Sequence, residues 1–298
     1  MPIEKSELIL NEDGSIYHLN LKPGEIAKNI ITVGDPDRVA KVSSFLDEVT
    51  FKKQKREFCT HTGRIGNQEV SVVSTGIGTD NVDIVINEID ALFNVDFETR
   101  EVKEELTFLN FIRIGTSGAL QPDIKIDSTI ISEYAFGFDT LMRFYKYRPS
   151  DEIAQHLHRD LNELLRNKNV YLLNYITTAG KTLFEKFSSL GKPGVTITNP
   201  GFYAPQNRSI RAELKFPHYK KLIQDFVSKK RQLTNMEMET AGIYGLAELF
   251  GHQAISLNAI LANRANGKFS EKPEDTVNHL IEKSLEVIEQ LNNDSTST

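Results

Sequence analysis

The chain has 298 residues, 39% of them hydrophobic and 26% charged, and its formal net charge is −6. This length is ample for a buried core and suits one large α/β domain or two small ones. The acidic balance argues against binding to nucleic acid, which needs lysines and arginines gathered on one face. A few local arginines can still form a positive pocket for a small anion.

Cys59 is the only cysteine, which excludes a disulfide within the chain and a cysteine-rich zinc site. The first residues carry no apolar segment of the kind found in signal peptides. No stretch approaches the ~18 apolar residues of a membrane span. We therefore expect a cytoplasmic protein that binds neither membranes nor nucleic acid.

Short apolar runs alternate with helical patterns along the chain. The apolar runs predict strands at residues 29–33, 58–65, 69–74, 108–114, 128–133, 171–177, 195–198 and 254–261. Apolar residues at helical spacing predict helices at residues 37–46, 82–93, 152–165, 239–250 and 276–291. Asp35 would cap the first helix and Pro36 would occupy its first position. Strands that alternate with helices imply an α/β fold with a largely parallel sheet covered on both faces.

Two segments stand outside this alternation. Residues 96–105 are charged and predict a solvated insertion between a helix and the next strand. Residues 292–298 are polar and predict a disordered tail. The chain shows no internal repeat and no low-complexity linker, so one domain over residues 1–291 is the simplest interpretation.

A first candidate anion site lies in the segment Gly34-Asp-Pro-Asp-Arg38, where a strand ends, a glycine turns and a helix begins. Free N–H groups at a helix start, together with the helix dipole, favour an anion. Arg38 lies in the first helical turn, where a cation is unfavourable unless an anion sits beside it. The alternative is an ordinary capped helix with a surface arginine.

A second candidate is Arg113-Ile-Gly-Thr-Ser-Gly118, which predicts a buried strand ending in a turn that offers backbone N–H groups and hydroxyls to phosphate. Arg113 interrupts an apolar strand, where a charge is costly unless it is paired. A structural ion pair with a carboxylate is therefore the alternative. Ligands of open α/β sheets bind beyond the carboxyl ends of the strands, where both segments lie.

Two further segments carry groups suited to a nucleoside. Glu237 and Glu239 precede a helix, where a carboxylate is favourable without any function, but an ionised carboxylate also suits the two hydroxyl donors of a sugar. Gln206 and Arg208 follow a strand and offer the donors and acceptor that match the edge of a pyrimidine-dione, and Phe202 could stack on its ring. Incidental polar residues in a loop are the alternative.

Five segments in this order resemble the uridine phosphorylase branch of the nucleoside phosphorylase-I family, and the match runs from Tyr17 to about Gln290. They are Gly34–Arg38, Ser74-Thr-Gly-Ile-Gly78, Arg113–Gly118, Gln206-Asn-Arg208 and Asn235-Met-Glu-Met-Glu239. The resemblance implies a single α/β domain whose central mixed sheet is partly closed into a barrel and flanked by helices.

The same resemblance assigns roles to individual positions. Phosphate would be held by Gly34, Arg38, Arg113 and Thr116, with Arg56 reaching the phosphate of a neighbouring subunit. Ribose would be held by Met238 and Glu239, with His18 crossing the interface to the 5′-hydroxyl. The base would contact Phe202, Gln206, Arg208 and Arg264. Arg113, Glu239 and Arg208 would act directly in catalysis.

The implied reaction is reversible phosphorolysis of uridine to uracil and ribose 1-phosphate in pyrimidine salvage. The resemblance implies a homodimer or a hexamer of dimers, with phosphate as co-substrate and neither a cofactor nor a catalytic metal. Some relatives bind potassium between subunits through a glutamate that matches Glu57 and a serine that matches Asn81. A structural monovalent cation near Glu57 is therefore a further expectation, which the asparagine puts in doubt.

Three alternatives remain. Purine-cleaving relatives carry Ser-Asp where this chain has Asn263-Arg264, which favours a pyrimidine, but residues 241–250 resemble the purine branch more closely. A purine nucleoside phosphorylase or a nucleosidase on the same fold is the first alternative. A nucleoside-binding module without turnover is the second. A dehydrogenase is a poor third, because Gly76-Ile-Gly78 lacks the third glycine of a dinucleotide loop.

Overall fold

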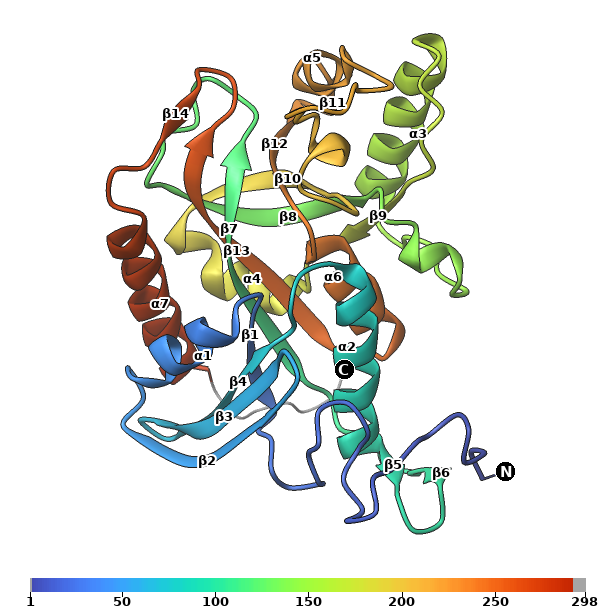
Figure 1. The fold of residues 1–298 in the computed structure, drawn as a ribbon, viewed down its shortest axis with the longest axis vertical. Coiled ribbons are helices and arrows are strands. Elements are labelled where there is room, and N and C mark those ends of the chain that lie inside the picture. The colour runs from blue at the N-terminus through green and yellow to red at the C-terminus, as the bar shows by residue number, and fades with distance from the viewer. Residues whose placement is uncertain (1, 292–298) are drawn as a thin grey trace.

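A twelve-stranded mixed sheet runs through the computed structural model, which describes residues 2–291 (Figure 1). Its main path follows the order β11–β12–β10–β8–β13–β7–β1–β4–β3–β2, with β14 paired to β13 and β9 to β8. The strands of this sheet are β1 (Asn29–Val33), β2 (Glu48–Lys55), β3 (Phe58–Ile65), β4 (Gln68–Ser74), β7 (Asn110–Ala119), β8 (Thr129–Gly137), β9 (Tyr175–Thr178), β10 (Lys192–Thr198), β11 (Val227–Ser228), β12 (Arg231–Glu237), β13 (Gln253–Asn263) and β14 (Lys268–Phe269). The tail predicted at residues 292–298 lies outside the described residues.

Five of these strands close into a barrel. β12 pairs in parallel with β10, and its end also pairs antiparallel with β7 through Met236 and Gly118. The ring β7–β13–β8–β10–β12 is thereby complete, and β1, β4, β3 and β2 extend from it as an open wing. This arrangement confirms the expected α/β fold with a mixed sheet partly closed into a barrel.

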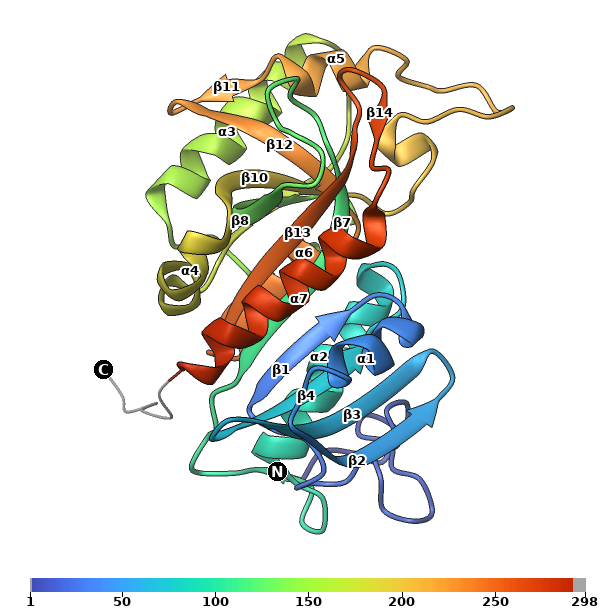
Figure 2. The same cartoon turned by 90° about the vertical axis from the view of Figure 1, so that its left-hand side faces the viewer.

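Seven helices pack on the described part of this sheet: α1 (Pro36–Ser43), α2 (Thr79–Asn94), α3 (Glu152–Asn167), α4 (Lys181–Phe187), α5 (Tyr219–Gln224), α6 (Thr240–Leu249) and α7 (Pro273–Glu289). Figure 2 shows α7 and α1 along one face, over β13 and the wing. Helices α2 and α6 pack together on the other face. Strand β7 is covered on both faces. Phe111 packs in the core on the α2–α6 side, and the next residue, Ile112, packs in the core on the α7 side. A strand buried on both faces is expected to be continuously apolar.

The predicted elements are confirmed in kind, with four corrections. Helix α1 ends at Ser43, and Phe45 and Leu46 continue it only as a turn with bonds to residues three positions earlier. Strand β9 is shorter than predicted. Strands β2, β11, β12 and β14 and helices α4 and α5 were not predicted. Strand β2 was missed because it is a charged edge strand, and β12 because it places polar side chains inside the barrel. The fourth correction concerns β7, which continues to Ala119 through the segment predicted to turn.

The charged insertion forms a small exposed hairpin, β5 (Val95–Asp96) and β6 (Glu101–Val102). It lies at the end of α2, far from the β14 end of the molecule in both views (Figures 1 and 2). Among residues 2–291, no helix combines the length and the apolar character needed to cross a bilayer.

Candidate active site

A pocket of about 820 Å³ opens beside the barrel, where the ends of β1, β4 and β12 meet the second half of β7. The segments predicted to bind phosphate, ribose and base all line it: Gly34–Arg38, Arg113–Gly118, residues 236–239 and the loop with Phe202, Gln206 and Arg208. These segments are up to two hundred residues apart in sequence, and the fold brings them to one cavity. The volume is within the range typical of small-molecule sites.

Arg113 lies on β7 with its guanidinium buried at one side of this pocket. Nη2 lies 2.6 Å from Glu239 Oε2 and 3.1 Å from Glu237 Oε2. Nη1 donates to Asn258 Oδ1 at 3.0 Å. Burial opposes the charged form, but the two carboxylates outweigh it and raise the pKa of Arg113. The ion-pair alternative is thus what the structure shows, with the pairing carboxylates themselves lining the pocket.

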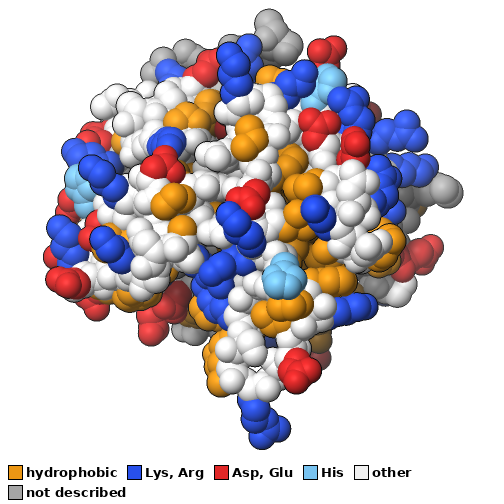
Figure 3. Space-filling view, turned by 90° about the horizontal axis from the view of Figure 1, so that it is seen from above, with side chains coloured by type: hydrophobic (Ala, Val, Ile, Leu, Met, Phe, Trp, Pro, Cys, Tyr) orange, Lys and Arg blue, Asp and Glu red, His pale blue; other side chains and the backbone are white. Residues whose placement is uncertain are grey.

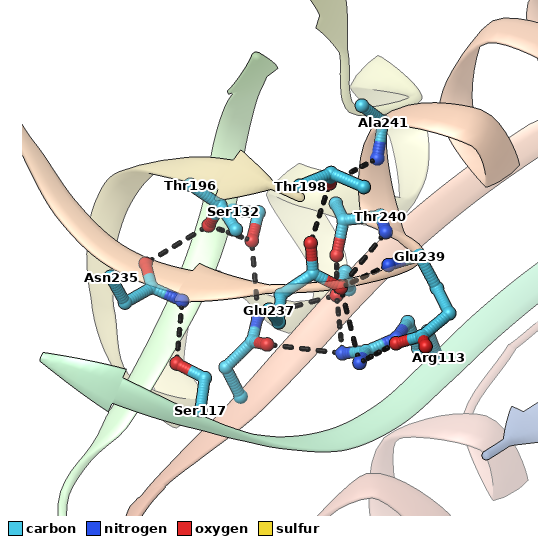
Figure 4. A network of polar contacts seen from close by, with 12 residues as sticks. Arg113, Ser117, Ser132, Thr196, Thr198, Asn235, Glu237, Glu239, Thr240 and Ala241 are labelled. Atoms are coloured by element: carbon cyan, nitrogen blue, oxygen red, sulfur yellow. Dashed lines mark hydrogen bonds and ion pairs between the residues drawn. The ribbon is translucent and has the colours of Figure 1, made fainter. Parts of the chain in front are cut away.

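Glu239 is the second centre of this network (Figure 4). Its Oε1 accepts from the Gly78 amide at 2.9 Å, so the glycine turn after β4 holds a carboxylate. Gly78 has a φ of 99°, a left-handed value that favours glycine. Burial raises the pKa of Glu239, and Arg113 opposes this shift. Each carboxylate oxygen has more than one acceptor site, so Glu239 can still accept hydroxyl donors from the pocket.

Glu237 anchors the start of α6. Its Oε2 accepts from the backbone amides of Glu239 and Thr240, both at 2.9 Å, and Oε1 accepts from the Thr198 hydroxyl. These bonds satisfy N–H groups that a helix start leaves unpaired. The residue that the sequence marked as a helix-start carboxylate therefore has that structural function, and it also fixes the backbone that carries Glu239.

Arg38 differs from Arg113 in having no partner. Within residues 2–291 its side chain makes no hydrogen bond or ion pair, although it is half-buried and lines the pocket. Burial lowers its pKa, and the nearby charge of Arg113 lowers it further. Asp35 and Glu239 partly oppose this shift. A half-buried cation without a bonded partner beside a cavity favours an anion there.

Part of the backbone predicted to bind an anion has partners within the fold. The Asp37 amide donates to the Asp35 side chain, the Arg38 amide to the Asp35 carbonyl, and Pro36 has no N–H. In the second segment, β7 continues as a strand paired with β13 through residue 119. Arg38, Arg113 and Thr116 line the pocket with their side chains, together with Gly34.

Gly115 leaves room for the guanidinium of Arg113. A Cβ at this position would lie 2.1 Å from Nη1 and 2.5 Å from Cζ of Arg113. We predict that Gly115→Ala displaces the guanidinium and raises the KM for phosphate at least tenfold, since small misplacements of a binding group can cost about 10²-fold. Thermal melting would separate this effect from unfolding, and an unchanged phosphate KM would contradict it.

The predicted base loop follows β10 and is held by Arg208. Its Nη1 donates to the Phe202 carbonyl at 2.8 Å and to Gln206 Oε1, and its guanidinium lies 3.9 Å from the centroid of the Phe202 ring. Phe202 therefore stacks on Arg208 and is 52% exposed. Figure 3 views the molecule from this end, where apolar side chains lie among lysines and arginines.

Arg264 lies behind this loop and does not line the pocket. It donates to the carbonyls of Gln206 and Asn207, and burial together with the charge of Arg208 lowers its pKa to about 10. The neighbouring Asn263 points elsewhere, because its Nδ2 donates to the carbonyls of Gln121 and Ile124. The two positions thus support the loop and the barrel end.

His18 and Arg56 are absent from the pocket of their own chain. Both lie beside Tyr17, whose ring packs edge-on against His18 and lies 6.0 Å from the Arg56 guanidinium. Glu57, the next residue, does line the pocket, so this cluster is near its rim. A Cβ on Gly76 would contact both Glu57 and Asn81, so the two positions expected to flank a monovalent cation are neighbours.

Several residues of the site were not singled out from the sequence. Ser256 and Asn258 on β13 both bond to Nη1 of Arg113. In the sequence they appear as two polar residues, two positions apart, inside an apolar run. Side chains two positions apart in a strand lie on the same face, which here is the face that contacts Arg113. Phe269 on β14, which lines the base end of the pocket, gave no comparable signal.

The α/β fold thus carries one pocket lined by arginines, carboxylates and apolar side chains. A family model described as the phosphorylase superfamily matches residues 28–292, and the chain belongs to this family. The resemblance to the nucleoside phosphorylase-I family is thereby confirmed.

Individual relatives agree on this class but differ in substrate. The chain is 31% identical over 280 residues to a uridine phosphorylase of Thermococcus kodakarensis, covering 93% of this chain and 88% of the relative. It is 26% identical to a DeoD-type purine nucleoside phosphorylase of Caldanaerobacter subterraneus subsp. tengcongensis, with 91% and 98% covered. A crystal structure of a Trypanosoma brucei nucleoside phosphorylase with uridine phosphorylase activity superposes with a TM-score of 0.82 at 25% identity, covering 95% and 98% of the two chains.

Proposed function

We propose that this protein cleaves the N-glycosidic bond of uridine, or of a close pyrimidine nucleoside, with inorganic phosphate. The observation that carries the proposal is the unpaired, half-buried Arg38 beside Arg113, in the pocket that also contains Glu239. An oxyanion between the arginines would lie next to a carboxylate able to accept sugar hydroxyls. The uridine phosphorylases among the relatives support the same assignment.

In the proposed reaction a phosphate oxygen forms a bond to C1′ of the ribose while the C1′–N1 bond breaks and its electron pair stays on the base. Arg38, Arg113 and Thr116 hold the nucleophile in line with C1′, which replaces a chance encounter by a positioned reaction. Glu239 holds the ribose hydroxyls, with Met238 beside the sugar. Phosphate and Glu239 stabilise the positive charge that develops on the sugar. The reaction needs no cofactor.

The base end of the pocket favours a pyrimidine. Gln206 and Arg208 line it, and Arg264 adds positive charge from behind, which stabilises a uracil anion as it leaves. An arginine cannot donate a proton near neutral pH, so this help is electrostatic. A purine leaves more readily when a carboxylic acid protonates it, and the position that the resemblance assigns to this acid is Arg264, which donates to the carbonyls of Gln206 and Asn207.

A second subunit completes the proposed site. The charged residues that line the pocket are three arginines against four carboxylates, namely Arg38, Arg113 and Arg208 against Asp35, Glu57, Glu237 and Glu239. This excess of negative charge disfavours binding of a phosphate dianion. Arg56 from a neighbouring copy would make the numbers of positive and negative side chains equal. A two-fold dimer exchanges such groups reciprocally. Sedimentation of an active monomer would exclude this part of the proposal.

A substrate panel tests the reaction. Uridine, thymidine, inosine and methylthioadenosine are incubated with and without phosphate, and the free base is measured. We expect phosphate-dependent release of uracil from uridine as the fastest reaction. Faster cleavage of inosine would support the purine nucleoside phosphorylase that the DeoD-type relatives suggest. Cleavage without phosphate would indicate a nucleosidase, and binding without turnover a non-catalytic module.

Replacement of Arg208 tests base recognition. Arg208→Ala removes the side chain that bonds Gln206 and faces the base end, so we expect kcat/KM for uridine to fall at least tenfold while the KM for phosphate changes little. Arg211 is an exposed arginine in the same loop, and Arg211→Ala serves as the control. Equal losses for uridine and inosine in Arg208→Ala would contradict a role in reading the base.

A further inference from the structure

Glu88 on α2 has a set of contacts that the proposed reaction does not use. Its Oε1 lies 2.6 Å from His18 Nδ1, and its Oε2 accepts from the Leu19 amide at 2.8 Å. The His18 amide donates to the same carboxylate at 3.0 Å. One carboxylate thus holds both the backbone and the ring of His18. The Glu88 side chain is only 13% exposed, whereas that of His18 is 27% exposed.

These contacts decide which ring nitrogen of His18 is available. A carboxylate accepts hydrogen bonds only, so Nδ1 must carry the proton that it donates to Glu88. The neutral ring then presents Nε2 as an acceptor, because the partner of one ring nitrogen fixes the state of the other. Tyr17 and Phe58 contact the ring edge-on from other directions, which limits its rotation.

We propose that Glu88 is a positioning residue, which keeps Nε2 of His18 turned outward as the acceptor for the 5′-hydroxyl of a nucleoside bound in a neighbouring copy. The inference rests on the proposed function, in which a second subunit completes the site, and on the resemblance, which implies that His18 crosses the subunit interface. The inference adds a residue that determines substrate choice. Glu88 favours nucleosides with a free 5′-hydroxyl without touching the substrate, because it acts through His18. A nucleoside that lacks the 5′-hydroxyl gains nothing from this arrangement.

The experiment compares uridine with 5′-deoxyuridine as substrates of the full-length protein. Four forms are measured: the unmodified protein, Glu88→Gln, His18→Ala and the double variant. Glutamine has one acceptor oxygen where Glu88 uses two, so it cannot satisfy all three N–H donors. We expect Glu88→Gln to lower kcat/KM for uridine about tenfold, the scale of one lost hydrogen bond, and to change 5′-deoxyuridine less than twofold. The loss should appear mainly in KM.

The double variant shows whether Glu88 acts through His18. In the His18→Ala background, Glu88→Gln should leave the ratio of the two substrates unchanged, since coupled residues are not additive. Glu69 forms an exposed ion pair with Arg64, and Glu69→Gln is the matched control that should not alter the ratio. Glu88→Ala, which removes every acceptor, should reproduce the effect more strongly, with melting temperatures checked for each variant.

Two results would overturn the inference alone. Equal losses for both substrates in Glu88→Gln would mean that Glu88 only supports the 17–19 backbone. A further change of the substrate ratio in the double variant would mean that Glu88 does not act through His18. Absence of uridine phosphorolysis in the unmodified protein would instead remove the proposed function, and this inference with it.

Discussion

Replacement of Arg113 by alanine is expected to lower kcat/KM for phosphorolysis by about 10²-fold or more, the scale of a lost electrostatic stabiliser. It should also raise the phosphate requirement, because Arg38 alone would face the dianion. The variant leaves Glu237 and Glu239 buried side by side without their shared cation. Breaking a buried pair in this way costs about 3–5 kcal/mol of the free energy of unfolding.

Because Arg113→Ala leaves two buried carboxylates without a cation, Arg113→Lys provides a second test that preserves the fold. Lysine keeps a positive charge between the carboxylates but lacks the planar fork that reaches Asn258 and Glu239 together. It should therefore retain most of the stability and still show a raised KM for phosphate. Arg64→Ala removes an exposed arginine and is the control for expression and folding. Intact phosphorolysis in a folded Arg113 variant would show that the anion does not bind there.

Local signals in the sequence were sufficient for most of the secondary structure. The apolar run at β1, the Asp35 cap of α1 and the apolar runs of β3 and β4 each reflect short-range chemistry, and each element formed. β12 and the second half of β7 were missed because their polar residues are satisfied inside a closed barrel. That environment arises only from pairing between distant strands, such as Met236 with Gly118.

The candidate site was likewise predicted in part from local sequence, and the rest depends on contacts between distant segments. Residue types and motif order located Arg38, Arg113 and Glu239, and the fold brings them to one pocket. The sequence did not indicate that Arg113 and Glu239 would bond to each other, nor that Glu239 would accept from the Gly78 amide. Both facts depend on side-chain geometry in the folded protein. Their consequence is chemical, because an anion in the proposed site would bind beside the carboxylates that pair with Arg113.

Glu239 is the second residue whose replacement should have a large effect. In Glu239→Gln the side chain keeps its size and one acceptor oxygen but loses the charge that stabilises the positive sugar. We expect kcat for uridine to fall by about 10²–10³-fold. The KM for phosphate should stay equal or decrease, since one carboxylate beside the anion is gone. This pattern is opposite to that of Arg113, where phosphate binding itself is lost.

The pH dependence gives Glu239 an independent test. Burial raises the pKa of this carboxyl, and only its ionised form can accept both ribose hydroxyls. Activity should therefore decline as the pH falls through a pKa above the ordinary value for glutamic acid, and Glu239→Gln should lack this decline. Phosphate itself titrates in the same way in the reactions of the unmodified protein and of Glu239→Gln. The ratio of their kcat/KM values at each pH therefore reports only the titration of the Glu239 carboxyl. A ratio that stays constant across the acid range, in a variant with a native melting temperature, would show that the charge of Glu239 has no part in the reaction.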